Sequence, residues 1–358
     1  MKEFDLIVIG AGPAGSSCAT LCAESGLDVL LLEASRFPRD KVCGDCLNPS
    51  VWPVLDRLGI SSRVRGLCSS SPEVIRFSVA GHGSVEFQLF RSPGEFVVRR
   101  RELDALLVER AVEKGARFQD GTPITSLWKS QGLWEITTSL GMRIKARRIV
   151  AADGRNSTVA RHLRMLASPL KDARIGLQTH IPHPSGYDGA IEMHLYRNGY
   201  GGLADLGEGL ANLCLVANEG SMRELRKEAE SRYHVNSAMA WRSITPIARR
   251  SARHIAKDGV FLCGDAAFVV EPFTGEGIGF ALRTGSLLAR ILISRRESLP
   301  GDQEERYWRA HRDLYRGKLR INYLTRFLSQ HPKMAHSLAP FFLRSPKLLS
   351  RLTHTVIQ

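Results

Sequence analysis

The 358-residue chain lacks several features that mark specialised classes of protein. No apolar run approaches the roughly 20 residues that a membrane-spanning helix needs. The chain has no internal repeat and no low-complexity linker. The amino terminus enters a predicted strand almost at once, so we expect no signal peptide. Together these absences favour a globular, cytoplasmic protein of about two domains.

Frameworks of disulfides or zinc ligands are also missing. The seven cysteines are an odd number, and several fall in predicted core elements, which suits a reducing compartment. A zinc site needs four ligands, and no second C-x-x-C or close histidine pair accompanies Cys43 and Cys46. We therefore expect no metal site.

Acidic residues are few relative to basic ones. The chain has 36 Asp and Glu against 50 Lys and Arg, a net charge of +14. This charge could attract nucleic acid, anionic lipid or an acidic protein. No nucleic-acid motif accompanies it, so we expect no nucleic-acid partner. Solvated surface charge is the ordinary interpretation. Peripheral membrane contact and an acidic redox partner are the alternatives.

The chain does contain two glycine-rich segments more than 240 residues apart. The first follows the apolar strand predicted over 5–9 and opens a predicted helix. Gly10 allows a sharp turn, Gly12 lets the backbone approach a pyrophosphate, and Gly15 permits close helix–strand packing. The phosphates would lie at the helix N-terminus. The residues assigned to nucleotide binding are Gly10, Gly12, Pro13, Ala14 and Gly15.

Glu33 ends the next predicted strand, at the spacing expected of a ribose-binding acid. A carboxylate there accepts hydrogen bonds from a free 2′-hydroxyl and repels a 2′-phosphate. The site therefore favours FAD or NAD over NADP. The alternative is that the glycines only form a turn in an ordinary α/β unit that binds no nucleotide. The order strand, glycine turn, helix, strand and acidic residue over 5–33 disfavours it.

The second glycine-rich segment runs from Gly264 to Gly277, after an apolar strand predicted over 260–263. A helix is predicted over 278–296. Gly275 and Gly277 leave room for a flat ring against the backbone, and the helix N-terminus stabilises negative charge on that ring after reduction. A plain NAD dehydrogenase needs no second site. The two segments together predict one bound FAD.

The predicted elements do not alternate simply. Strands over 74–79 and 84–89, and a β-like pattern from 175 to 217, interrupt the nucleotide-binding segments. We predict an α/β fold in which a Rossmann-like FAD-binding domain is interleaved with a β-rich substrate domain, followed by C-terminal helices. The FAD-binding domain is expected over 1–70, 91–170 and 246–300, the substrate domain over 71–90 and 171–245, and the helical region over 301–358.

Three further segments carry a family resemblance. They are Arg100–Asp104 (R-x-x-x-D), Asp153-Gly154 and Lys41–Leu47 (K-x-C-G-x-x-L). With the two glycine-rich segments, they resemble the superfamily of para-hydroxybenzoate hydroxylase, and are most similar to the geranylgeranyl reductase family. The resemblance implies an FAD enzyme over residues 10 to 280.

The resemblance also implies roles for single residues. Arg100 would contact the FAD, as a guanidinium suits phosphate or ribityl oxygens. Asp153 would lie near the FAD and the nicotinamide donor, and the same segment could cap a helix through Asn156, Ser157 or Thr158. Asp265 would bind the ribityl chain. The remaining flavin-side residues are Pro272, Gly275, Gly277 and Ile278.

Cys43 is the candidate catalytic residue. By resemblance, Cys43 and Gly44 run over the flavin, where the thiol would donate a proton as hydride arrives. The alternative is a loop that only covers the cofactor. A thioredoxin-type dithiol of Cys43 and Cys46 is disfavoured, because it needs a helix N-terminus after a strand.

One segment departs from the family. Archaeal-type reductases line their prenyl tunnel with Y-x-W-x-F-P. Here Tyr200 is present, but Gly202, Ala204 and Asp205 replace the other three residues. Tyr200 is assigned to the substrate, in a tunnel of different shape. The halogenase motif W-x-W-x-I-P is absent.

The leading hypothesis is an FAD-dependent oxidoreductase that passes hydride from reduced flavin to a carbon–carbon double bond of an apolar or lipid substrate, for which a prenyl chain is one candidate. A class A flavin monooxygenase and a non-catalytic flavin-binding protein are the alternatives. The electron donor is NAD(P)H or an acidic redox protein, since no separate nicotinamide motif is present. Residues 303–358 are basic and amphipathic, as expected of a packed helical cap or a face that meets anionic membrane.

Overall fold

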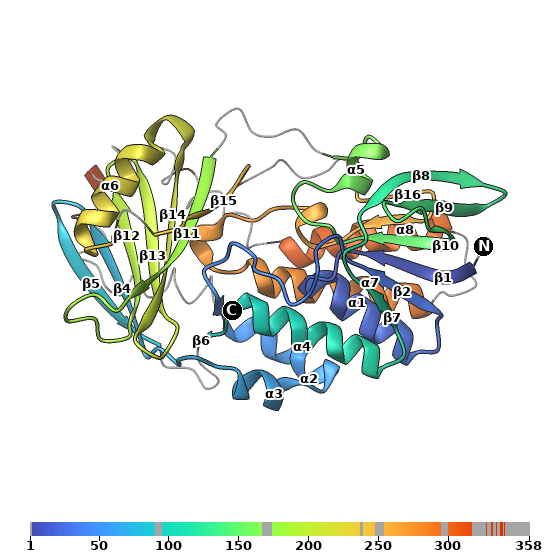
Figure 1. Ribbon diagram of the computed structural model, residues 1–358, viewed down its shortest axis with the longest axis horizontal. Helices are drawn as coiled ribbons and strands as arrows, with labels where there is room; N and C mark the ends of the chain where they lie inside the picture. The colour runs from blue at the N-terminus through green and yellow to red at the C-terminus, as the bar shows by residue number, and fades with distance from the viewer. Residues whose placement is uncertain are drawn as a thin grey trace.

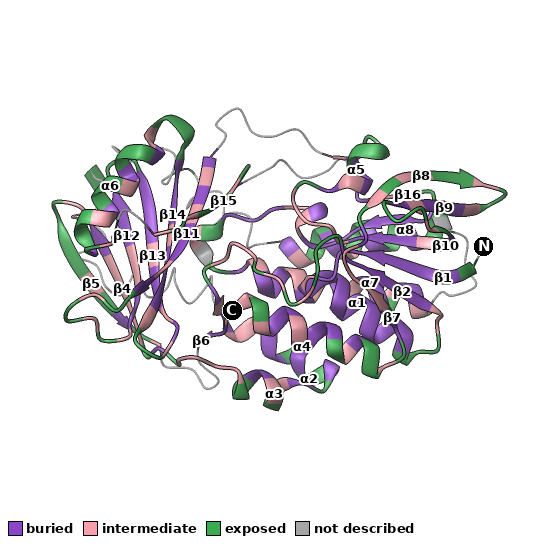
Figure 2. Ribbon diagram, in the orientation of Figure 1, coloured by how far each residue is buried: buried purple, intermediate pink, exposed green. Residues whose placement is uncertain are grey.

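A computed structural model shows two sheets side by side, joined by several crossings of the chain (Figure 1). The structure describes residues 2–89, 95–166, 174–236, 239–247, 254–294 and 300–316, and single residues between 327 and 340. The first sheet has eight strands and the second has seven. Buried residues concentrate in the central strands of the first sheet and in helix α1 (Pro13–Glu24) (Figure 2).

The first sheet forms the Rossmann-like domain. Its path runs in the order β16-β17-β10-β1-β2-β7, and the five strands from β17 to β7 are parallel. The strands of this sheet are β1 (Lys2–Ile9), β2 (Val29–Leu32), β7 (Arg117–Gln119), β8 (Ile124–Ser130), β9 (Leu133–Thr138), β10 (Arg143–Ala151), β16 (Ala256–Lys257) and β17 (Val260–Leu262).

The second half of the central strand β1, Leu6–Ile9, is continuously apolar and buried, as expected of a strand covered on both faces. The carboxyl ends of β1, β2, β10 and β17 meet at one edge of the sheet. Ligands of open α/β sheets bind at that edge. Strand β10 is continuous over nine residues, because its register with β1 is the same before and after residue 147.

Helices α1, α4 (Arg100–Glu113) and α7 (Gly277–Ser294) cover the sheet (Figure 1). After β3 the chain forms a helix, α2 (Trp52–Leu58), followed by α3 (Ser61–Gly66). Pro53 lies in the first turn of α2, Gly59 ends the helix with φ +69°, and its apolar side chains join the core.

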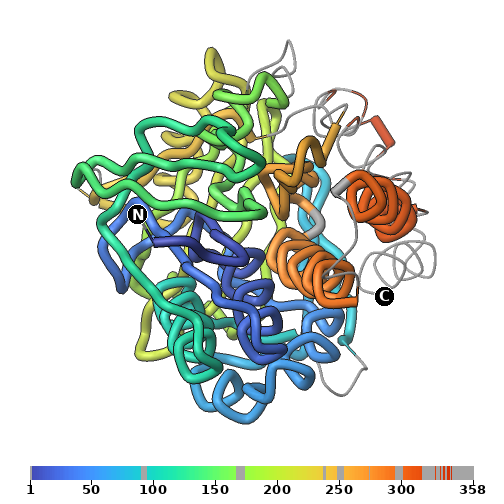
Figure 3. Tube along the Cα trace, turned by 90° about the vertical axis from the view of Figure 1, so that its right-hand side faces the viewer, coloured from blue at the N-terminus to red at the C-terminus, as the bar shows by residue number. Residues whose placement is uncertain are grey.

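Helices α1 and α7 lie against each other (Figure 3), although they are far apart in the sequence. A Cβ atom at Gly285 would come within 2.1 Å of Ser17 Oγ and 2.2 Å of the Ala14 carbonyl oxygen. Among the described residues, α7 is the one helix long and apolar enough to cross a membrane, with mean hydropathy 1.3. We interpret it as a core helix, since 56% of that window is buried against the rest of the domain.

The second sheet consists of strands from the two segments expected to form the substrate domain. Its order is β15-β11-β14-β13-β12-β4-β5, mostly antiparallel, with β12 parallel to β4. These strands are β4 (Val74–Val79), β5 (Gly83–Gln88), β11 (Arg174–Pro182), β12 (Ile191–Tyr196), β13 (Gly199–Asp205), β14 (Leu210–Asn218) and β15 (Arg242–Ile244).

Helix α6 (Met222–Arg232) packs on the outer face of the second sheet (Figure 1). The sequence analysis gave this region no helix. Met222, Leu225 and Ala229 recur at helical spacing and are buried in one cluster with the sheet. A two-stranded ribbon, β3 (Cys46–Leu47) with β6 (Phe96–Val97), lies between the domains.

Helix α8 (Pro300–Tyr315) packs against α7 and β16. The Tyr307 hydroxyl donates to the Leu262 carbonyl over 2.8 Å, and the Tyr315 ring stacks on Phe280 with 4.4 Å between centroids. This part of the expected helical region is a packed cap. The rest, from residue 317 on, lies outside the described residues apart from a few single positions.

Candidate active site

One cavity of about 500 Å³ lies where the carboxyl edge of the first sheet meets the second sheet. Both glycine-rich segments contribute to its wall. The expected site residues that line it are Gly10, Gly12, Pro13, Ala14, Glu33, Cys43, Gly44, Arg100, Asp153, Tyr200, Asp265, Pro272, Gly275, Gly277 and Ile278. Gly15 does not line it. A Cβ at Gly15 would lie 1.9 Å from the Gly10 carbonyl oxygen, so this glycine serves close packing behind the wall.

Glu33 lies at the nucleotide end of the cavity. Its carboxylate accepts hydrogen bonds from the backbone N–H of Ala11, at 2.9 Å, and of Ser35, at 3.1 Å. These bonds hold the acid beside the glycine turn. A Cβ at Gly12 would meet only the tip of Arg39, at 3.7 Å, so the backbone there is open to a close ligand.

Arg100 is the first residue of α4 and is oriented by Asp104. Its Nε donates to Asp104 Oδ1 at 3.0 Å, and its Nη2 to Oδ2 at 2.8 Å. Asp104 is fully buried and also pairs with Arg39 at 2.9 Å. The sequence analysis assigned no role to Asp104 or Arg39. The i,i+4 spacing within R-x-x-x-D was the available signal for Asp104.

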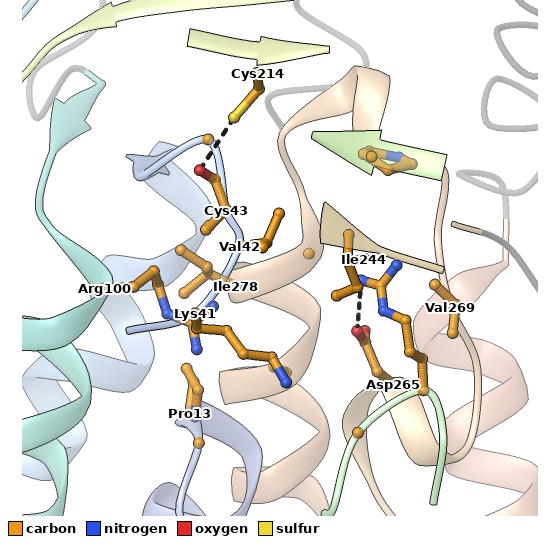
Figure 4. A pocket seen from close by; sticks show the side chains of 18 of the residues that line it. Pro13, Lys41, Val42, Cys43, Arg100, Cys214, Ile244, Asp265, Val269 and Ile278 are labelled. Atoms are coloured by element: carbon orange, nitrogen blue, oxygen red, sulfur yellow. Dashed lines mark hydrogen bonds and ion pairs between the residues drawn. The ribbon is translucent and has the colours of Figure 1, made fainter. Parts of the chain in front are cut away.

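Lys41 lies among the cations of this cavity without a partner of its own. It forms no hydrogen bond or ion pair with any residue that the structure describes, whereas Arg155 pairs with Asp265 at 3.1 Å. Figure 4 shows Lys41 reaching into the space between Pro13 and Asp265. Burial, and then Arg100, lower the pKa of Lys41. An unpaired, half-buried ammonium beside a helix N-terminus fits a phosphate.

Asp153 follows β10 and faces the start of α5 (Thr158–His162). Its Oδ2 accepts from Thr158 N–H at 2.7 Å and from Val159 N–H at 3.2 Å, while Ser157 Oγ caps the helix by accepting from Ala160 N–H. Ser157 is thus the cap among the three candidates. Asp153 Oδ1 is buried with no hydrogen-bond partner among the described residues.

The second glycine-rich segment forms the flavin end. Asp265 follows β17 in a 3₁₀ turn, and its carboxylate accepts from Arg155. A second 3₁₀ turn begins at Pro272 and ends at Gly275, whose φ of +66° is accessible to glycine. Helix α7 begins at Gly277. Cβ atoms at Gly275 and Gly277 would meet nothing within 4 Å, so both positions face open space.

These observations fit FAD. The cavity supplies two helix N-termini, an unpaired cation, an unpaired Asp153 oxygen and glycines that leave space open. The nucleotide would be held by Gly12 and Glu33, and the ring end by Asp265 and the start of α7.

Cys43 lies where the flavin end meets the second sheet. The sheet holds its backbone: Cys214 Sγ donates to the Cys43 carbonyl oxygen at 3.2 Å (Figure 4), and Asn212 Nδ2 donates to the same oxygen at 2.8 Å. The Asp45 N–H lies 3.4 Å from Cys43 Sγ. Burial raises the pKa of the Cys43 thiol, and Arg100 opposes the shift. The thiol is therefore protonated at neutral pH.

Asp45 anchors the loop around Cys43. It has a left-handed φ of +59°, and its carboxylate accepts from the Arg100 N–H at 3.1 Å and from Asn212 Nδ2 at 2.8 Å. Gln178 in turn donates to Asn212 Oδ1 at 3.0 Å. Burial raises the pKa of Asp45 to about 7. Sequence reasoning missed Asn212 and Gln178, since no local pattern marks a contact between distant strands.

Tyr200 lines the cavity, but its hydroxyl is engaged. It donates to Glu271 Oε1 at 2.7 Å, and Glu271 forms a fully buried, two-pronged ion pair with Arg174. Glu271 precedes the Pro272 turn and Arg174 begins β11. The cluster therefore ties the flavin end to the second sheet. No sequence motif marks either charged residue.

The remaining wall of the cavity is apolar and belongs largely to the second sheet. Gly202 and Ala204, which replace larger family residues, both line it and leave it wide. Its apolar side chains include Ile75, Leu177, Ile191, Met193, Leu203, Val216, Ile247 and Phe273. Such a wall accepts an apolar molecule.

Comparisons with known proteins agree with this site. The family of FAD-binding domains matches residues 3–173 and 217–301. A menaquinone reductase of Mycobacterium tuberculosis (strain CDC 1551 / Oshkosh) is 31% identical over 81% of this chain and 77% of its own length. Digeranylgeranylglycerophospholipid reductase 2 of Methanopyrus kandleri is 26% identical over 81% of this chain and 76% of its own.

Solved structures share the fold. The flavin-dependent brominase Bmp2 matches with a TM-score of 0.80 at 17% identity, over 99% of this chain and 94% of its own. A probable FAD-dependent monooxygenase from Pseudomonas aeruginosa matches with a TM-score of 0.78 at 19% identity, over 93% of this chain and 98% of its own. Both glycine-rich segments and Glu33 line one cavity, and the family match covers all of these residues. The chain therefore belongs to the FAD-binding domain family and is an FAD-dependent oxidoreductase.

Proposed function

We propose that this oxidoreductase reduces a carbon–carbon double bond in an apolar, isoprenoid substrate. The observation that carries the proposal is the position of Cys43, a half-buried thiol between the FAD cradle and the apolar wall of one cavity. The names of the two relatives support it, because menaquinone and digeranylgeranylglycerophospholipid both carry isoprenoid chains.

Bound FAD, once reduced, supplies hydride to one carbon of the double bond. The other carbon needs a proton, and Cys43 Sγ is the acid that this chain offers. Its thiol is protonated because burial raises its pKa. The thiolate left behind would face the Asp45 N–H and the Arg100 guanidinium, which stabilise negative charge. The role of Cys43 is therefore that of general acid.

The second sheet would bind the isoprenoid chain. Its wall offers few hydrogen-bonding groups, and Tyr200 presents a ring whose hydroxyl already serves Glu271. Gly202 and Ala204 leave space for branched methyl groups. The shape of the apolar wall would therefore orient the isoprenoid chain, while the polar side chains of the cavity face the cofactor.

The test is a single-turnover experiment. Holoenzyme reduced with dithionite under argon is mixed with a short-chain menaquinone or with geranylgeraniol. Excess dithionite is removed before mixing, and the extract is reoxidised in air so that any quinol returns to quinone. Mass spectrometry should then still show a gain of two hydrogens, located in the isoprenoid chain by fragmentation, and the flavin absorbance should return at the same rate. No hydrogenated product with either compound would refute the proposal.

A monooxygenase is the second candidate, on the basis of the shared fold. It predicts oxygen consumption that depends on the substrate, and a product that gains an oxygen atom. The same reduced holoenzyme, mixed with substrate in aerated buffer, separates the two reactions. Hydrogenated product under argon, with no oxygenated product in air, favours the reductase.

A lipid-borne substrate would require the protein to meet a membrane. We place the protein in the cytoplasm, where its net charge of +14 supports peripheral binding to the surface of an anionic bilayer. Sedimentation with anionic and with neutral vesicles tests this. Binding to anionic vesicles that fades with salt is expected, and equal absence from both pellets would reject it.

A further inference from the structure

Glu95 is a buried carboxyl group that the proposed mechanism does not use. The residue is 6% exposed and lines the cavity. Its carboxyl forms no hydrogen bond or ion pair with any residue that the structure describes; only its backbone oxygen accepts, from Ser71 Oγ. Burying a carboxyl without a partner is costly. A carboxyl that lines a cavity and has no protein partner among the described residues is a candidate ligand-binding group.

Asn48 stands opposite Glu95. In the β3–β6 ribbon, Cys46 pairs with Val97 and Leu47 with Phe96, so the next positions along the two chains are Asn48 and Glu95. Asn48 is 3% exposed and also lines the cavity. Its Oδ1 accepts from Ser50, while its Nδ2 is buried with no acceptor among the described residues. The Glu95 carboxyl and the unpaired Asn48 Nδ2 therefore belong to facing positions of the ribbon and line the same cavity.

The pair lies close to the flavin end. A Cβ at Gly279, in the first turn of α7, would be 3.4 Å from Asn48 Oδ1. Behind the ribbon, Val97 packs with Ala204 and Leu206 of the second-sheet side. Glu95 and Asn48 thus form a polar spot at the border between the FAD cradle and the apolar wall.

The charge state of Glu95 selects the ligand. Burial raises the pKa of this carboxyl to about 8, so it is mostly neutral at pH 7. A neutral carboxyl both donates and accepts a hydrogen bond. It suits a carbonyl or hydroxyl oxygen. A phosphate would have to shed its water in an apolar cavity, and the unpaired Lys41 points away from this spot, into the space between Pro13 and Asp265 (Figure 4).

We propose that Glu95 and Asn48 bind the neutral oxygen of an apolar substrate, such as a quinone carbonyl or an isoprenoid alcohol, and disfavour an anionic head group. This deepens the proposed function by naming the class of head group. Glu95 is thus a residue that determines substrate specificity. The hydrogen bond from its O–H holds the head-group oxygen of the substrate, and the isoprenoid chain lies along the second sheet.

The test measures binding, not turnover. Oxidised holoenzyme is titrated at pH 6.5 with geranylgeraniol, with geranylgeranyl phosphate and with a short-chain menaquinone, and the flavin absorbance change gives each Kd. The alcohol should bind at least about tenfold more tightly than its phosphate. Glu95→Leu should weaken the alcohol about tenfold, since one buried hydrogen bond is lost. Glu95→Gln, which still donates and accepts, should stay within about threefold of the parent.

Glu73→Leu is the matched control, because Glu73 is exposed and lies outside the cavity wall. It should leave every Kd unchanged. Equal binding of alcohol and phosphate by the parent, an unaltered Kd in Glu95→Leu, or no binding of either neutral probe would overturn the proposal. Failed hydrogenation with intact, Glu95-dependent binding would instead overturn only the proposed reaction.

A second measurement applies if Glu95→Leu does not fold. Between pH 7 and 9 the parent should lose affinity for the alcohol as Glu95 ionises, while Glu95→Gln should not. The neighbouring Cys46 stays protonated in this range because burial raises its pKa well above the ordinary value, and Arg65, which stacks on Phe96, stays charged. Parallel pH profiles for the two proteins would contradict the assignment.

Discussion

Replacement of Glu271 by leucine should destabilise the protein by about 4 kcal/mol. Glu271 and Arg174 are a buried pair, with side chains 0% and 3% exposed. Breaking such a pair from one side costs roughly 3–5 kcal/mol, because the remaining charge stays in a dry site. The Tyr200 hydroxyl also loses its acceptor, which costs about 1–3 kcal/mol. Burial of the new leucine offsets about 1–2 kcal/mol.

The assay is urea denaturation of the holoprotein, followed by tryptophan fluorescence at a fixed excess of FAD. The matched control is the double variant Arg174→Met/Glu271→Leu, in which no charge is left behind. It should recover about half or more of the loss, since well-packed apolar replacements of buried ion pairs are often neutral. Tyr200→Phe alone should cost about 1 kcal/mol.

Two results would refute this reasoning. A Glu271→Leu variant within about 1 kcal/mol of the parent would mean that the pair is solvated or not formed. A double variant as unstable as the sum of the two singles would mean that the residues act independently. Either result would remove the basis for treating the cluster as the tie between the flavin end and the second sheet.

Three further outcomes are expected. Glu33→Ala should weaken FAD binding, measured by flavin fluorescence, by roughly one to a few kcal/mol; unchanged affinity would move the ribose site elsewhere. Cys43→Ser should keep FAD but slow flavin reoxidation by substrate about 10²–10⁴-fold, and Cys46→Ser should not; equal rates in both would leave the loop structural. Burial raises the pKa of Asp45 from 3.8 to about 7, so the parent should lose unfolding free energy as pH rises through this window. Asp45→Asn should flatten that slope, and matching slopes would count against a buried, shifted carboxyl.

The sequence predicted the parts of the site that depend on local chain order. The glycine turn after β1, Glu33 after β2 and Gly277 at the start of α7 each follow an apolar strand or open a helix, so short windows contain the whole signal. Parallel strands then bring these points to one edge. The roles of Asp265 and Asp153 came from the family resemblance, and both residues follow strands whose carboxyl ends meet at this edge.

Contacts between distant segments carried no such signal. Asn212 holds the Cys43 carbonyl from 169 residues away, and Glu95 faces the cavity only because β6 pairs with β3. Helix α6 was not predicted because most of its residues are charged or polar, which is typical of an exposed segment. Its packing depends on a few apolar residues such as Leu225, which is buried against the second sheet. These features depend on how the domains pack, which periodicity alone does not encode.

The contact between α1 and α7 also dictates when the cofactor site can exist. Ribosomes add roughly 5–20 residues per second, so α1 emerges tens of seconds before Gly285 is made to cover it. Until then β17 and the flavin-end turn are absent. The nascent chain has only the nucleotide end of the FAD site, and the face of α1 that α7 covers is exposed. FAD therefore cannot be enclosed until after most of the chain has been synthesised. Premature termination before α7 should yield a fragment recognised by chaperones or proteases, not a weakly binding flavoprotein.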